Sequence, residues 1–182
     1  MRRARGSSER GANEVEFALV LTLILGPLLF GVMDMSRALF AYHFVSEAAR
    51  EACRYAVVRG STWTSKGACA TTTAYECDAT AANVTSFVKA TVPLGIPITG
   101  TPVTATSCPA AAPTIAGTLS VCTAWPGTNP GTGTCSSTSP GNNPGCYVEV
   151  QVQYLFKFTL PFISKELTTI NLQSTSEMVI QQ

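Results

Sequence analysis

The chain has 182 residues, of which 46% are hydrophobic and 13% charged, and its formal net charge at pH 7 is +1. This length suffices for one modest domain and a membrane segment, and it is too short for two full domains. A nearly neutral chain has no field that would attract nucleic acid, so nucleic-acid binding is not expected.

The N-terminal third contains a candidate membrane-spanning helix. Four arginines come before an apolar run at residues 15–33. At ~1.5 Å per residue this run just crosses a hydrocarbon core of ~30 Å. The positive-inside rule then predicts a cytoplasmic N-terminus. A secretory signal peptide cleaved near Ser36 and Ala38 is the competing interpretation.

The helical pattern continues beyond the apolar run, which argues against cleavage there. Glu47 and Arg50, and likewise Glu51 and Arg54, are spaced to pair across one turn of the solvated face. The opposite face carries small side chains that allow close approach, so it predicts packing on the domain's own sheet, on another subunit, or on both at different heights. This stripe runs to about Arg59 at steps of three and four: Ala38, Ala41, Val45, Ala48, Ala52 and Tyr55.

Gly26 and Pro27 lie inside the apolar run. Proline removes the hydrogen bond to the carbonyl of Leu23 and clashes with that turn, so a kink or local unwinding is expected. A hydroxyl at Thr22 can bond back to a free carbonyl and reduce the cost.

Seven cysteines are many for this length, and none forms the close C-x-x-C pair of structural zinc sites. Disulfides in an oxidising compartment are therefore expected, and no metal or cofactor is. Cys53 stands apart among alanines of the long helix and is interpreted as a buried free thiol. The other six permit fifteen pairings, of which the sequential one would close a loop between Cys135 and Cys146. The disulfide candidates are Cys69, Cys77, Cys108, Cys122, Cys135 and Cys146.

The region after residue 60 predicts a small α+β domain. Asp78 is the expected N-cap of a short helix that ends before Pro93. Residues 115–123 are a strand candidate, residues 148–158 alternate in the way of a strand with one buried face, and residues 170–180 repeat that period more weakly. The fold class is thus α+β: a long helix, membrane-spanning in its first half, packed on a small antiparallel sheet with disulfide-stapled loops.

A family resemblance rests on the N-terminal residues. Gly11 comes shortly before the apolar run, and Glu16-Phe17 follows it, as in a prepilin cleavage motif. Together with Phe30-Gly31, Asp34 and the segment at 47–56, these residues resemble the TadE-like pseudopilins of the Flp/Tad tight-adherence system. The resemblance implies a pilin-like fold and cleavage by prepilin peptidase between Gly11 and Ala12. It implies a basic leader at 1–11, a helix at 12–59 and an extracytoplasmic domain at 60–182.

Glu16 has a physical role that can be argued from its position. An ionised carboxylate at the edge of hydrocarbon costs several kcal/mol unless it is paired or reaches the headgroups. After cleavage, the new amine of a neighbouring subunit, at a similar depth, is one partner for Glu16; the lipid headgroups are the other. Phe17 would belong to the same assembly contact by resemblance.

The sequence offers no catalytic set, since His43 is the single histidine and lies near the predicted membrane surface. The expected function is that of a minor pseudopilin of a Flp/Tad pilus apparatus in the bacterial inner membrane. Its expected partners are other pilin and pseudopilin subunits, inner-membrane Tad proteins, prepilin peptidase and the lipid bilayer. The alternative is a membrane-anchored extracytoplasmic module that binds a ligand through its disulfide-bonded loops.

Overall fold

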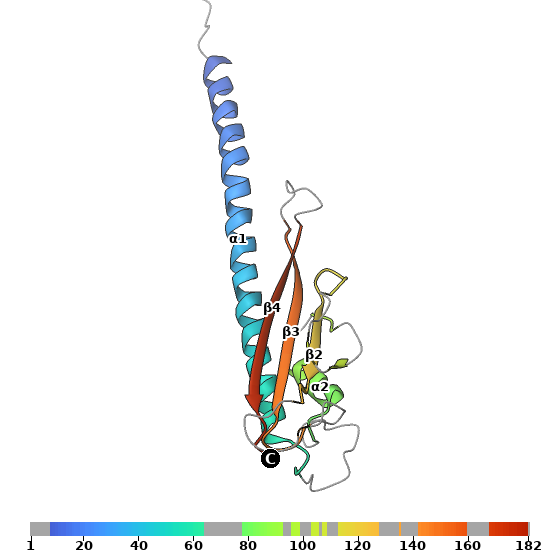
Figure 1. The fold of residues 1–182 in the computed structure, drawn as a ribbon. Coiled ribbons are helices and arrows are strands. Elements are labelled where there is room, and N and C mark those ends of the chain that lie inside the picture. Colours follow the sequence, from blue (N-terminus) through green and yellow to red (C-terminus); the bar gives the residue numbers. More distant parts are fainter. Residues whose placement is uncertain are drawn as a thin grey trace, which may run out of the picture.

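The computed structural model describes residues 8–63, 78–92, 96–98, 103–105, 107–108, 113–127, 135, 142–159 and 168–181. A single long helix, α1 (Ser8–Val58), stands beside a small sheet, and its N-terminal half extends beyond the rest of the described fold (Figure 1). A second helix, α2 (Ala81–Thr91), lies near the lower end of the sheet. The predicted α+β fold class with a long N-terminal helix is confirmed.

The sheet has four strands within the described residues, in the order β1-β2-β3-β4. They are β1 (Val103–Ala105), β2 (Leu119–Ala124), β3 (Tyr147–Lys157) and β4 (Thr169–Val179). The last three pair in antiparallel fashion as predicted, and the short β1 pairs with β2 in parallel. Strand β2 begins later than predicted because Gly117, at φ 81°, turns the chain just before it.

One face of the sheet packs on both helices and forms the core. Val148, Val150 and Val152 of β3 are fully buried there, in one cluster with Val84 of α2. The predicted small-residue stripe of α1 lies in this interface: Ala41, Val45, Ala48, Ala52 and Tyr55 are at most 8% exposed, and Ala38 is half-buried. Small side chains therefore let α1 lie close against its own sheet. Of the packing partners that the sequence left open, the domain's own sheet is thus the one that this part of the stripe contacts.

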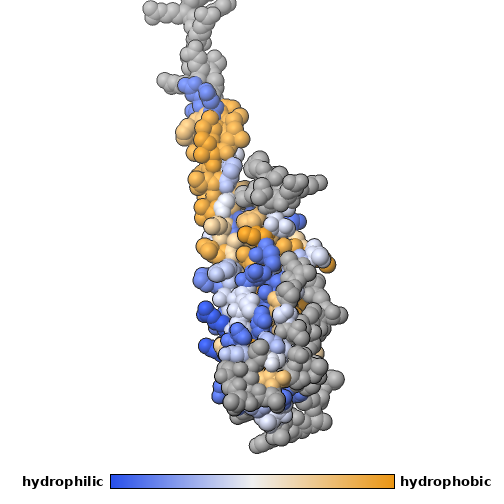
Figure 2. Space-filling model, in the orientation of Figure 1, coloured by the Kyte–Doolittle hydropathy of each residue, from blue (hydrophilic) through white to orange (hydrophobic). Residues whose placement is uncertain are grey.

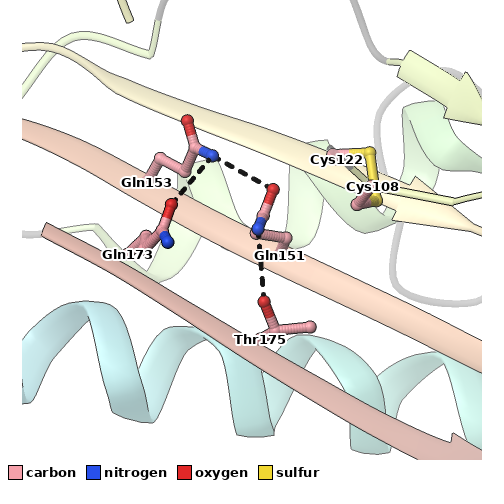
Figure 3. The surroundings of a disulfide bond; sticks show 6 residues. All are labelled: Cys108, Cys122, Gln151, Gln153, Gln173 and Thr175. Carbon is pink, nitrogen blue, oxygen red and sulfur yellow. Dashed lines mark hydrogen bonds between the residues drawn. A yellow bond between two sulfur atoms is a disulfide. The ribbon is translucent and has the colours of Figure 1, made fainter. Parts of the chain in front are cut away.

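The opposite face of β3 is more buried than its alternating sequence indicated. Gln151 and Gln153 point to this face and are 8% and 1% exposed, although one buried face was predicted. Their burial is tolerated because the amides are hydrogen-bonded: Gln153 Nε2 donates to Gln151 Oε1 at 3.1 Å, and Gln151 Nε2 donates to Thr175 of β4 at 3.3 Å (Figure 3). The Cys108–Cys122 disulfide lies near them, and Cys122 is the register partner of Gln151.

Two disulfides are present among the described cysteines. One joins Cys108 to Cys122, which lies within β2, and the other joins Cys135 to Cys146 just before β3. Both belong to the sequential pairing. Cys69 and Cys77, the remaining candidates, lie outside the described residues.

Helix α2 begins two residues later than Asp78 would place it. Its N-cap is Thr80, whose hydroxyl accepts a hydrogen bond from the backbone N–H of Asn83 at 3.2 Å. Asp78 instead contributes its backbone carbonyl, which accepts from the Asn83 side chain. The predicted N-cap was therefore wrong, because Thr80, which is also a favoured capping residue, is extended and caps the helix two positions later.

Candidate functional site: the N-terminal helix and its exit from the apolar segment

The N-terminal half of α1 has an apolar surface on all sides. Figure 2 shows a mostly hydrophobic surface on the visible face of this part of the helix, below a hydrophilic tip. Within the described residues one helix is long and apolar enough to cross a membrane, and its most apolar window has no buried residue. Such a helix indicates membrane anchoring. The most exposed apolar residues include Val15, Phe17, Leu23, Ile24, Met33 and Phe40.

The residues of the predicted processing motif lie on the first turns of α1. Glu16 and Phe17 are both exposed, Phe17 to 70%. Gly11 is open as well, because a Cβ built on it would meet no atom within 4 Å. The helix begins at Ser8, so the peptide bond between Gly11 and Ala12 lies in its first turn rather than before it.

Pro27 lies within α1, which remains helical through Gly26 and Pro27. The hydroxyl of Thr22 donates to the carbonyl of Ala18 at 2.8 Å. This bond is the expected back-bonding of a hydroxyl to the carbonyl four residues earlier. It does not reach the carbonyl of Leu23, which is the one that loses its N–H partner because of Pro27. A bend at this point stays a prediction.

The charged face of the lower half of α1 is solvated. Arg54 and Glu51 form the predicted ion pair at 2.9 Å. Glu47 and Arg50, both described, do not form the second one. An exposed pair of this kind contributes little, so its presence or absence changes neither fold nor site.

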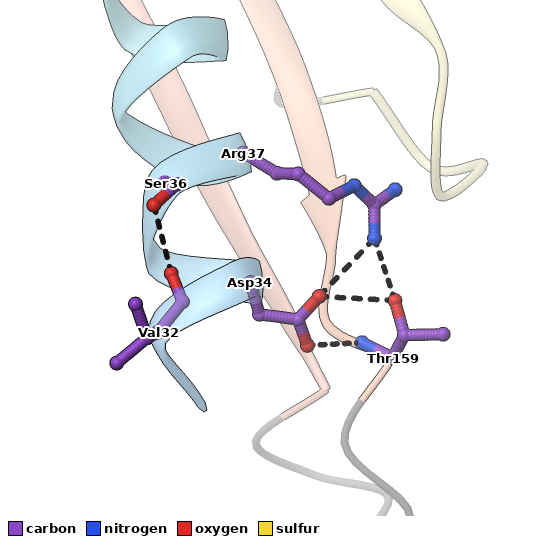
Figure 4. Close-up of polar contacts among 5 residues, drawn as sticks. All are labelled: Val32, Asp34, Ser36, Arg37 and Thr159. Carbon is purple, nitrogen blue, oxygen red and sulfur yellow. Dashed lines mark hydrogen bonds and ion pairs between the residues drawn. The ribbon is translucent and has the colours of Figure 1, made fainter. Parts of the chain in front are cut away.

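A polar cluster lies where α1 leaves the predicted span, and we call Asp34, Arg37 and Thr159 the exit cluster (Figure 4). Asp34 Oδ2 accepts a hydrogen bond from the backbone N–H of Thr159 at 2.7 Å, and Asp34 Oδ1 accepts one from its hydroxyl at 3.1 Å. Arg37 Nη1 donates to Asp34 Oδ1 at 3.1 Å and to Thr159 Oγ1 at 2.7 Å. The cluster therefore fastens the end of β3 to the helix.

The electrostatics of the exit cluster favour an ionised Asp34. Burial alone would raise the pKa of this carboxyl group, but the two hydrogen bonds from Thr159 and the positive charge of Arg37 outweigh burial and lower the pKa below its ordinary value. Asp34 is only 4% exposed, whereas the Arg37 side chain remains 56% exposed. The carboxylate is thus hidden and the guanidinium is presented outward.

Sequence reasoning did not find the exit cluster. Asp34 and Thr159 are separated by 125 positions, and no local pattern connects them. One available signal was an acidic residue directly after the apolar run, because a carboxylate at that depth needs a partner.

An apolar groove of about 750 Å³ runs beside the exit cluster, between α1 and β3. Leu29 and Met33 form its upper end on α1, and Phe44 its lower end. Ser36, Arg37 and Phe40 line it between these ends, with Ile96, Tyr154 and Phe156 opposite.

Cys53 of α1 is fully buried against β3, and its thiol donates to the carbonyl of Val148 at 3.7 Å. Burial raises the pKa of the Cys53 thiol to about 11; a hydrogen bond with Ser176 acts against this rise, and the charge of Glu177 adds to it. A thiol that stays protonated is a poor nucleophile. Cys53 is buried and forms no disulfide, which confirms its interpretation as a buried free thiol.

The fold and this helix define a class: an α+β protein carried on a long apolar N-terminal helix of membrane-spanning length. Residues 11–54 match the family described as TadE-like protein, which confirms the resemblance drawn from the sequence. The TadE-like family is associated with Tad/Flp pili, and the match covers 44 of the 182 residues of this chain. No curated protein and no solved structure matches the chain.

Proposed function

We propose that this chain is a minor pseudopilin that supports assembly of a Flp/Tad pilus through its N-terminal helix. The observation that carries the proposal is the family match at residues 11–54, which begins at the glycine of the cleavage motif. The matched segment includes the part of α1 whose apolar surface is exposed in the described fold, from Val15 to Phe40. A helix of this kind can serve both as an anchor and as a surface for other subunits.

The proposal includes processing by prepilin peptidase between Gly11 and Ala12. The exposed Gly11 gives a protease access without a side chain in the way. Since the bond lies in the first turn of α1, that turn must open before cleavage, and helix ends open at little cost in free energy. Mass spectrometry of the membrane-extracted protein tests this step. An N-terminus at Ala12 is expected, whereas Met1 or a start near Leu39 would contradict processing at this site.

Glu16 is the proposed assembly residue, pairing with the new amine of a neighbouring subunit. Its side chain is exposed at the start of the apolar surface, where an ionised group benefits most from a partner of opposite charge. We expect Glu16→Gln to leave the protein in the membrane fraction and to reduce pilus output strongly. Glu14→Gln is the matched control, because Glu14 is also exposed two positions earlier.

The outcomes of this pair of variants are distinct. Loss of piliation with Glu16→Gln alone supports the amine contact. Equal piliation in both variants, or an equal loss in both, contradicts a specific role for Glu16 and leaves headgroup contact as its explanation.

We further propose a single-pass topology in the inner membrane, with residues 1–11 in the cytoplasm and residues 60–182 on the outer side. The two disulfides support an oxidising compartment for the domain. Its proposed partners are pilin and pseudopilin subunits, inner-membrane Tad proteins and the peptidase. A reporter enzyme that is active only outside the cytoplasm, fused after Gln182, should be active; an inactive fusion at normal protein level would contradict this orientation.

A further inference from the structure

We propose that the groove between α1 and β3 binds one phospholipid of the surrounding bilayer, with an acyl chain in the groove and its phosphate on Arg37. The inference rests on the membrane-anchored placement proposed above. The groove is separate from Gly11, Ala12 and Glu16, the residues that the processing and assembly experiments test, although its upper end belongs to the apolar surface proposed for other subunits.

The groove is continuous with the apolar surface that would face lipid. Leu29, Val32 and Met33 line its upper end, and all three belong to the predicted span. These side chains are 58%, 61% and 62% exposed, so nothing in the described fold covers them. From this end the lining continues past the exit cluster to Phe44. A lipid chain can therefore enter the groove from the bilayer without crossing water.

The dimensions of the groove suit an acyl chain. With the phosphate on Arg37, the part of the groove that leads toward the bilayer runs from Leu29 to Arg37, ~12 Å at ~1.5 Å per residue, which is close to the ~15 Å of one leaflet. Its volume of about 750 Å³ lies in the range of pockets that hold small apolar ligands, ~300–1000 Å³.

The charge at the groove favours an anionic headgroup. Asp34 is buried and its two oxygens are occupied by Thr159 and Arg37, whereas the Arg37 side chain is more than half exposed. Only Nη1 of Arg37 takes part in hydrogen bonds to the described residues, and the other terminal nitrogen points away from Thr159 (Figure 4). The Phe156 ring, 5.8 Å from the guanidinium carbon, helps to hold this orientation. Arginine held in this way presents a fork suited to phosphate.

Native mass spectrometry of the full chain in detergent micelles tests the proposal. The micelles are supplied with equal amounts of phosphatidylglycerol and phosphatidylcholine. We expect one retained phospholipid per chain, with at least a fivefold preference for the anionic one. Arg37→Gln should abolish this preference, and Arg37→Lys should restore part of it because the charge is kept. Arg50→Gln is the control: it removes an exposed arginine from the same helix, outside the groove.

A second pair of variants tests the groove itself. Ser36→Trp places a large ring in the lining and should displace the lipid, whereas Met35→Trp adds the same ring one position away, where the residue does not line the groove. Circular dichroism verifies that each variant folds. Loss of lipid with both Trp variants, or with neither, would overturn the proposal. A change from dimer to monomer with Ser36→Trp alone would also overturn it, because the groove would then bind a second copy of the chain. Piliation of Glu16→Gln is a separate measurement, so failure of the assembly role is distinguishable from failure of the lipid site.

Discussion

The close approach of α1 to the sheet can be tested at Ala52. This side chain is fully buried in the cluster that α1 forms with Val148 and Val150 of β3. Replacing it with leucine adds three carbon atoms where a methyl group now fills the space. Leucine is a good helix former, so α1 itself is not weakened, and the change acts on the contact with the sheet.

The expected magnitude follows from the packing. Ala52 has no exposed surface, so the added atoms gain no room from solvent and must displace the helix or the strand. Overpacking of this kind costs ~1–3 kcal/mol. The equilibrium constant for unfolding should therefore rise by a factor of ~5 to ~150, since ~1.4 kcal/mol corresponds to a factor of ten.

Urea unfolding of the full chain in detergent micelles measures this effect. Trp125 is 1% exposed and belongs to the same core, so its fluorescence reports the loss of packing. The matched control is Arg50→Leu, which adds an apolar side chain to the exposed face of the same helix and should change stability by less than ~0.5 kcal/mol. If Ala52→Leu is as neutral as the control, α1 does not lie against the sheet as described.

Three further predictions concern the domain beyond the apolar segment. Thr80→Ala removes the hydroxyl that accepts from Asn83 and should lower stability by ~0.5–2 kcal/mol in the same urea titration; no change would mean that α2 is capped otherwise. Replacing Cys108 and Cys122 together with serine should cost ~3 kcal/mol in the chain-entropy model for a loop of this size, and a variant as stable as the unchanged chain in the same urea titration would contradict it. Cys53 has a folded-state pKa of about 11 against an ordinary 9.0, so its contribution to stability is complete below pH 9 and is lost as pH rises through 11. Cys53→Ala should reduce this loss of stability at alkaline pH, and an unchanged pH profile of stability would exclude the thiol as its cause.

The sequence was sufficient for the elements whose patterns are local. The long helix, its small-residue stripe and the alternating strand β3 all follow from periodicities of three to four or of two, and burial of one face is enough to enforce them. The N-cap of α2 was misplaced because Asp78 and Thr80 are both good capping residues only two positions apart.

The remaining features depend on contacts between distant parts of the chain. Gln151 and Gln153 look like solvent-facing residues of a strand, and their burial depends on amide pairing with each other and with Thr175. The exit cluster joins α1 to the residues just after β3, and the groove beside it is formed by side chains of both elements. Neither arrangement has a local pattern in the sequence, so only the folded chain reveals them.

The lower half of α1 is attached to the sheet domain at both of its ends. Asp34 holds Thr159 at the upper end, and the carbonyl of Val57 accepts a hydrogen bond from the N–H of Gln181 at 3.0 Å at the lower end. These two attachments are ~35 Å apart along the helix axis. A pull on the N-terminal segment along that axis would therefore load both attachments and the buried interface between them at once, in shear. A subunit drawn out of a membrane by its helix would carry its domain along as a rigid body instead of peeling away from it.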